Sequence, residues 1–209
     1  MPSAPSEIID ALESVMDIFL SDIRHRERSA FVLCDNLVEM ACKRKNQQHC
    51  RQTSQQPPLR CDFHDALRLP GFRLSNAFRD SLQQRREIRN LMQHQSSTVA
   101  VDLHTCADAI KDLPTLFRKL WGRNSLDNLR DWHRVALRIV NLYSSNGNPA
   151  QRQLFEDSMR DGNWRTDLEV RKPRMNENII QPGRRGHWGL LTKNAPVLVE
   201  QVLNSCDIP

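Results

Sequence analysis

The segment Arg89-Asn90-Leu91-Met92-Gln93-His94 brings together side chains that are suited to phosphate chemistry. An imidazole has an ordinary pKa of about 6.5, so it can accept or donate a proton near neutral pH. A guanidinium can bind a phosphate through parallel hydrogen bonds and can stabilise charge that develops on it. Arg89, Asn90 and His94 are therefore the first candidates for a functional site.

The spacing of Arg89 and His94 is not specific by itself, because Arg44 and His49 are separated by the same number of residues. The alternative interpretation is a structural Arg89 in a core ion pair and a solvent-exposed His94 at a helix end. Glu87 lies on the same helical face as His94 and is a candidate supporting residue, although a surface position is the simpler interpretation.

The setting of Arg89 carries more information than its spacing. On a helical wheel, Arg85 and Arg89 fall within one apolar arc, whose other members are Leu74, Phe78, Leu82, Ile88 and Met92. An arginine that faces a core needs an acidic partner. Asp35 and Glu39 interrupt an earlier, largely apolar helix, and we expect them to supply that partner.

Residues 165–193 form a second candidate surface, with seven Lys or Arg residues and three acidic residues. Within them, glycines at 183, 186 and 189 would let the backbone approach a phosphate, and Trp188 could stack on a base. We predict RNA contacts for Arg184, Arg185, His187 and Trp188. The alternative is a solvated loop.

The six cysteines, at positions 34, 42, 50, 61, 106 and 206, include no CxxC pair. One group has enough ligands for zinc but matches no common zinc module in its spacing: Cys42, His49, Cys50, Cys61 and His64. The simpler interpretation is a set of free thiols in a reducing cytoplasm. We therefore expect no metal and no other cofactor.

The composition narrows the class of protein. The 209 residues carry a formal charge of +5, and the basic residues are 24 Arg and only 6 Lys, which favours an anionic partner such as nucleic acid. The absence of GxGxxG, GxxxxGK[ST] and GxSxG argues against the nucleotide-binding and hydrolase folds that depend on them. No apolar run is long enough for a membrane helix, and no secretory signal is present, so we expect a cytoplasmic protein that does not bind membranes.

Hydrophobic periodicity predicts an all-α protein. We expect helices over 6–23 with Ser6 as the N-cap, 28–44, 74–95 and 102–112, a short helix from Pro114 to about 120, and helices over 125–144, 149–160 and 195–204. Residues 45–60 read as a polar loop, and 162–193 have no clear period. The expected organisation is a helical bundle over 1–120 followed by a mainly helical C-terminal extension over 121–209, which contains the basic loop.

The segment Arg89-Asn90-x3-His94 at the end of the third long helix resembles the signature of the HEPN family of small all-α domains, many of which are ribonucleases. The run Leu33-Cys34-Asp35-Asn36-Leu37-Val38-Glu39 on the second helix and the variable loop between the two helices are also similar to that family. The resemblance covers roughly residues 6–120. A subset of HEPN toxins has Tyr two residues after the His, where this chain has Ser96, so tyrosine modification by a nucleotidyltransferase antitoxin is not expected.

The resemblance implies a HEPN-like bundle with metal-independent endoribonuclease activity, acting as a toxin or defence effector. In that family His94 would be base or acid, Arg89 would stabilise the phosphate, Asn90 would orient either group, and Asp35 or Glu39 would hold Arg89. Arg89 and His94 lie about 140° apart on a helix, which implies a composite site in a homodimer or a kinked helix end. Besides RNA and a second copy, an antitoxin or a defence-system protein is an expected partner.

Two alternatives stay open at this point. The first is a catalytically inactive HEPN-like domain that binds RNA or a protein partner. The second is an unrelated helical adaptor in which the Arg-x4-His spacing has no function.

Overall fold

The computed structural model describes residues 3–21, 23–57, 61–94 and 100–160. All regular structure in these ranges is helical, with seven α-helices, one 3-10 turn and no strand: α1 Ser6–Phe19, α2 Arg26–Thr53, α3 Phe63–Ala66, α4 Asn76–His94, α5 Leu103–Trp121, η1 Arg123–Leu126, α6 Asp131–Tyr143 and α7 Pro149–Arg160. The all-α prediction is confirmed for this part of the chain. The basic segment 165–193 and the predicted helix over 195–204 lie outside the described residues.

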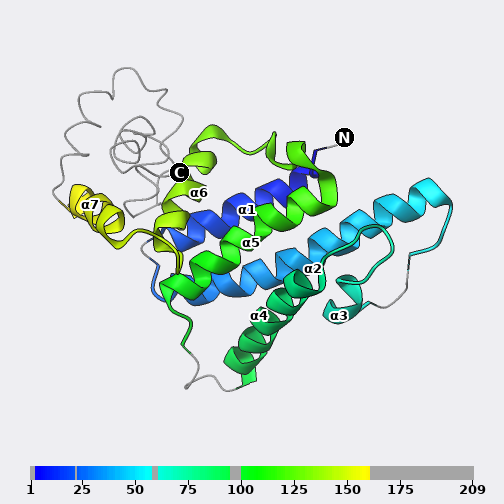
Figure 1. Cartoon of the computed structure of the whole chain (residues 1–209), viewed down its shortest axis with the longest axis horizontal. Coiled ribbons are helices and arrows are strands. Elements are labelled where there is room, and N and C mark those ends of the chain that lie inside the picture. The colour runs from blue at the N-terminus through cyan, green and yellow to red at the C-terminus, as the bar shows by residue number, and fades with distance from the viewer. Residues whose placement is uncertain (1–2, 22, 58–60, 95–99, 161–209) are drawn as a thin grey trace.

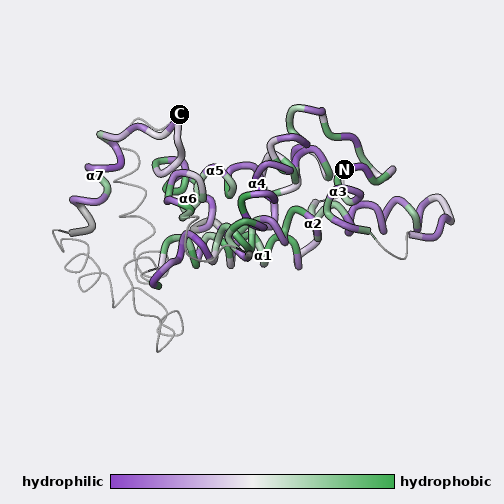
Figure 2. Tube along the Cα trace, turned by 90° about the horizontal axis from the view of Figure 1, so that it is seen from below, coloured by the Kyte–Doolittle hydropathy of each residue, from purple (hydrophilic) through white to green (hydrophobic). Residues whose placement is uncertain are grey.

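The core forms where α1, α2 and α5 meet. Helix α2 packs along both α1 and α5, running antiparallel to α1 and parallel to α5 (Figure 1). Figure 2 shows hydrophobic residues gathered in this central part of the molecule. Its largest fully buried side chains include Phe19, Phe31, Phe117 and Trp121. Each buried side chain of this size contributes about 1.5–3 kcal/mol to stability, so these three helices form the fixed frame of the molecule.

Helix α1 is shorter than predicted. It begins at Ser6 after Pro5, and no side chain caps its first turn, so the assignment of Ser6 as the N-cap was wrong. It ends at Phe19, and Ile23, which fits the apolar stripe by spacing, is 56% exposed. The chain turns between Leu20 and Arg26, so the helix ends although the apolar spacing of its sequence continues.

Helix α2 is longer than predicted, and the loop expected from residue 45 is wrong as far as Thr53. Gln, Lys and Arg are good helix formers, so a polar run does not by itself end a helix. The extension is held by buried Asn46 and Cys50 and by a hydrogen bond from Trp121 Nε1 to Gln48 Oε1 at 2.9 Å. Gly71 lies against this part of α2, where an added Cβ would meet the Cα of Asn46 at 3.0 Å.

Helix α5 is one continuous helix, whereas the sequence predicted a break before Pro114. Proline in a helix interior removes one hydrogen bond and costs about 3 kcal/mol. Apolar residues on both sides of Pro114 are buried in the same core, among them Ile110, Leu113, Phe117 and Leu120. Their burial outweighs the local cost and keeps the helix continuous.

Helices α4 and α7 agree closely with their predicted bounds, whereas the short helix α3 was not predicted. Helix α4 was expected over 74–95, and α7 was expected over 149–160, where Asn148 caps it through a hydrogen bond from the backbone N–H of Ala150 at 2.9 Å. Helix α6 begins at Asp131 rather than at 125, because η1 occupies the preceding residues. Apolar residues of α6 belong to the same hydrophobic cluster as α1, α2 and α5. No helix among the described residues is long and apolar enough to cross a membrane.

The start of α5 provides a pH-dependent stability prediction. Asp102 caps the helix by accepting a hydrogen bond from the backbone N–H of Thr105 at 2.7 Å, which lowers the pKa of the Asp102 carboxyl. Asp102→Ala is therefore expected to lower the free energy of unfolding by about 1 kcal/mol at pH 7. The carboxylate stabilises the fold above its ordinary pKa of about 3.9, and this contribution is lost as the pH falls through the lowered pKa.

Urea unfolding between pH 7 and pH 3 measures this difference. The exposed Asp10 of α1 provides the control, since Asp10→Ala removes a carboxylate that caps no helix. A difference between wild type and Asp102→Ala that does not shrink at low pH would contradict the capping role.

Candidate functional site

Three arginines attach α4 to its neighbours. Arg85, Arg86 and Arg89 are half-buried, whereas only Leu82 and Met92 of this helix are fully buried apolar residues. Arg85 Nη2 lies 2.7 Å from Asp112 Oδ2 on α5. Arg86 and Arg89 face α2, so α4 lies over both α2 and α5 and is tied to each of them by charge.

Asp35 of α2 is the centre of the cluster. Arg86 donates a hydrogen bond from Nη1 to Asp35 Oδ2, and Arg89 Nε lies 3.6 Å from the same oxygen. Arg86 Nη2 also lies 3.8 Å from Glu39 Oε2. The prediction that Arg89 pairs with an acid of the second helix is therefore confirmed for Asp35. The prediction is wrong for Arg85, because the side of α4 that carries it faces α5 and Asp112.

The sequence did not single out Arg86, although it makes the most contacts in the cluster. Besides its two acidic partners, its guanidinium lies 4.9 Å from the centre of the Phe63 ring on α3. On the helical wheel Arg86 falls about 40° outside the predicted apolar arc, so the sequence gave it less weight than Arg85. The two acids one turn apart on α2, buried Asp35 and half-buried Glu39, were a usable sign, since two carboxylates in such a place need more than one cationic partner.

Burial dominates the electrostatics of the cluster. The Asp35 side chain is only 2% exposed, and this burial raises the pKa of its carboxyl group, although Arg86 and Arg89 act in the opposite direction. Asp35 Oδ1 has no hydrogen-bond partner among the described residues. Burial likewise raises the pKa of Asp112, against the influence of Arg85. The carboxylate of Asp35 thus depends on its two arginines for compensation of its charge.

The C-terminal end of α4 carries the other predicted site residues. Asn90 Oδ1 accepts a hydrogen bond from Arg89 Nη1 at 3.2 Å, so Asn90 contacts Arg89 directly. His94 is the last residue of α4. Glu87 is exposed, and the structure does not bring it into the cluster of Asp35 and the arginines. Arg184, Arg185, His187 and Trp188 lie outside the described residues.

A surface groove of about 520 Å³ runs between α1 and α2 beside the cluster. Its charged lining is paired: Lys43 Nζ donates to Glu39 Oε1 at 2.6 Å, and Arg44 Nη2 lies 2.8 Å from Glu7 Oε1. Glu39 therefore belongs to both the groove and the Asp35 cluster. Arg44, which is followed by a histidine at the same spacing as Arg89, pairs with Glu7 and therefore points to the α1 side of α2.

The cysteine and histidine residues considered for zinc do not form a ligand cluster. Among the described residues, no three His, Cys, Asp or Glu side chains are grouped so that they could hold a metal ion. Cys42 and Cys50 are buried, whereas His64 is exposed on α3. Burial raises the pKa of Cys42 to about 12, so this thiol is protonated at neutral pH.

A second buried polar cluster joins α1 to α6 and was not predicted. His133 is 0% exposed, with Nδ1 3.1 Å from Glu13 Oε1 and Nε2 3.3 Å from Asp17 Oδ1. The backbone N–H of Arg130 also donates to Glu13 Oε1 at 3.0 Å. Glu13 stands within the apolar spacing of α1, which was the available sign. His133 is fully enclosed, and its contacts with Glu13 and Asp17 fix α6 to α1.

No protein-family model, no curated protein and no solved structure matches this chain.

The chemistry of the Asp35 cluster centres on the guanidinium of Arg89. This group is held beside a buried carboxylate, and its side chain is 17% exposed. Five residues later on the same helix comes a histidine. A fixed cation and an ionisable imidazole at one helix end are the groups needed to bind a phosphodiester and to move a proton on it.

Proposed function

We propose that this protein is a metal-independent endoribonuclease of the HEPN type. The observation that carries the proposal is the attachment of Arg89 to buried Asp35, in the last two turns of the helix that ends at His94. Arg86 donates a hydrogen bond to Asp35. Arg89 is a second cation beside the same carboxylate, more loosely paired at 3.6 Å, and it also donates a hydrogen bond to Asn90.

In the proposed reaction RNA supplies its own nucleophile. The 2′-OH gives its proton to a base and forms a bond to the adjacent phosphorus, while the bond from phosphorus to the 5′-oxygen breaks and that oxygen takes up a proton. The products are a 2′,3′-cyclic phosphate and a 5′-OH. His94 acts as the base or the acid. Arg89 stabilises the charge on the pentacoordinate phosphate, Asn90 orients the group next to it, and Asp35 positions Arg89.

The active form that we propose is a homodimer. Helix α4 is continuous from Asn76 to His94, so a kink between Arg89 and His94 does not redirect either residue. Positions five residues apart on a regular helix are separated by about 140° around its axis. This favours a composite site in which one copy contributes Arg89 and a second copy contributes His94 to the same phosphate.

The remaining parts of the proposal follow from the sequence. Residues 1–120 would form the HEPN-like bundle, and the C-terminal extension over 121–209 would add RNA contacts through Arg184, Arg185, His187 and Trp188. We place the protein in the cytoplasm, as a toxin or defence effector whose further partner is an antitoxin or a defence-system protein.

The test is cleavage of a defined RNA by the full chain in the presence of a chelator. We expect 2′,3′-cyclic phosphate and 5′-OH ends, no cleavage of the same oligonucleotide with 2′-O-methyl groups, and equal rates with and without chelator. Binding of both RNAs without cleavage of either would contradict the proposal.

That last outcome would favour a catalytically inactive HEPN-like domain for RNA or protein binding. The supporting observation is that Arg85, Arg86 and Arg89 all pair with acids, so each of them has a structural role in holding α4.

A further inference from the structure

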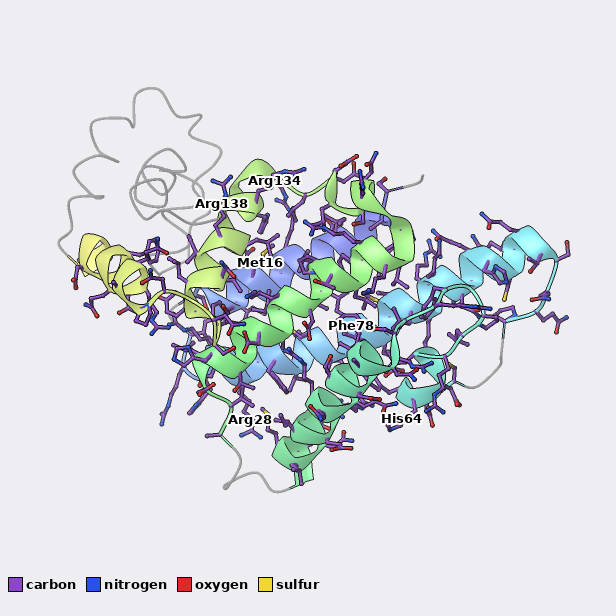
Figure 3. All side chains as sticks on the ribbon, viewed as in Figure 1. Met16, Arg28, His64, Phe78, Arg134 and Arg138 are labelled. Atoms are coloured by element: carbon purple, nitrogen blue, oxygen red, sulfur yellow. The ribbon has the colours of Figure 1, made fainter. Side chains whose placement is uncertain are left out.

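Arg28 of α2 reaches the C-terminal end of α4. Its Nη2 donates a hydrogen bond to the backbone carbonyl of Met92 at 2.8 Å, which joins two residues 64 positions apart in the sequence. The side-chain view labels Arg28 near the lower end of α4, away from Phe78 at the other end of that helix (Figure 3). The sequence did not predict this contact. The Met92 carbonyl lies in the last turn of α4, which ends at His94.

The end of a helix is the part that most needs such a contact. The last four carbonyl groups of an α-helix have no donor within the helix, and they carry the negative end of its dipole. Met92 is two residues before the last residue of α4, so its carbonyl belongs to this set. A guanidinium is a favourable partner there, since it provides both a hydrogen bond and a positive charge.

Arg28 also forms part of a regular pattern on α2. Arg28, Asp35 and Glu39 are spaced by seven and four residues, which places them on one face of the helix. Each of them contacts α4, and the contacts proceed in the opposite direction along it: Arg28 to Met92, Asp35 to Arg89 and Arg86, and Glu39 to Arg86. One stripe of α2 therefore holds successive turns of α4, and Arg28 holds the last of them.

We propose that Arg28 is a positioning residue that caps α4 and fixes its last turn relative to the turn that carries Arg89. This inference rests on the proposed function, because its purpose is to present His94 in a constant place. If Asp35 alone held the helix, the turn beyond Arg89 would be free to fray, as uncapped helix ends do. The hydrogen bond from Arg28 to the Met92 carbonyl removes that freedom.

The experiment compares Arg28→Met, which keeps the aliphatic stem, with Arg28→Lys, which keeps a charged donor. The control is Arg24→Met, which removes the same charge from an exposed residue close by in the sequence. In the full chain, we expect Arg28→Met to speed amide hydrogen exchange in residues 91–94 about tenfold, the change that corresponds to one lost hydrogen bond of a charged group. Exchange in residues 82–86 stays unchanged.

For RNA cleavage we expect kcat of Arg28→Met to fall about tenfold, in step with the exchange, while KM changes less than about twofold. Arg28→Lys should restore most of both losses, and Arg24→Met should show neither. Exchange of residues 91–94 that matches wild type in Arg28→Met would overturn the cap. Faster exchange with unchanged kcat would overturn the positioning role. If the wild type cleaves no RNA, the proposed function and the positioning role fall together, while the exchange result still decides whether Arg28 caps α4.

Discussion

Replacing Arg89 with methionine is expected to lower the rate of RNA cleavage about a thousandfold, whereas replacing Arg86 with methionine should lower it far less. A single group that stabilises developing charge in a transition state is worth about a hundredfold to a thousandfold, and an arginine on a transferring phosphate is worth more. Arg86 lies one turn earlier on the same helix and faces the same acid, so it is a matched control for charge, helix position and burial.

The two substitutions should have the opposite order of effects on stability. Arg86 donates to Asp35, lies near Glu39 and covers the ring of Phe63, so Arg86→Met should lower the free energy of unfolding by about 2–3 kcal/mol. Arg89 lies 3.6 Å from Asp35 without a well-aligned hydrogen bond, and its loss should cost about 1 kcal/mol.

A fluorogenic RNA assay, corrected for the folded fraction from urea unfolding, separates the two effects. His94→Ala is the third variant, and it should lose cleavage as fully as Arg89→Met does. Equal specific rates for Arg86→Met and Arg89→Met would show that Arg89 acts only by holding α4, and the catalytic assignment would fail.

Replacing Asp35 with alanine should give the largest loss of stability at the site, about 3–5 kcal/mol. The substitution leaves Arg86 and Arg89 half-buried without their shared acid. Asp112→Ala is the matched comparison, because Asp112 is half-buried on the other side of α4 and pairs with one arginine, Arg85, within the described part of the chain. We expect Asp112→Ala to cost about half as much.

A double variant tests the cause of this loss. If uncompensated guanidinium charge is responsible, Asp35→Leu combined with Arg86→Met should recover at least about half of the stability that Asp35→Leu loses alone, as buried ion pairs replaced by apolar groups commonly do. Losses that simply add in the double variant would show that Asp35 and Arg86 stabilise the fold independently.

The sequence predicted those parts of the fold in which local pattern and tertiary packing agree. Helix α4 ends at His94 as its period and the following Ser-Ser-Thr indicate, and the polar residues within apolar arcs correctly predicted that Asp35 and Arg89 would meet. A buried charge is informative because it has few ways to be compensated, so the type of its partner can be inferred before the partner is known.

The sequence failed where distant contacts override local preference. Nothing near residue 45 shows that the segment around Gly71 will lie against Asn46, and nothing near Pro114 shows that both sides of it enter one core. The choice between Arg85 and Arg86 as the partner of Asp35 depends on where α5 lies, which periodicity within α4 does not contain.

The attachment of α4 by charged groups also restricts how this helix can sit. Apolar side chains can repack when one helix slides along another, but the contacts of Arg28, Arg85 and Arg86 are directional and end on particular oxygen atoms. A shift by one helical turn, about 5.4 Å, would break all of them together. These contacts therefore fix the register of helix α4 on α2 and α5. Inserting or deleting one residue between Arg86 and Arg89 would rotate the residues after it by about 100° about the helix axis and shift them by about 1.5 Å, so Arg86 and Arg89 would no longer face the same acid.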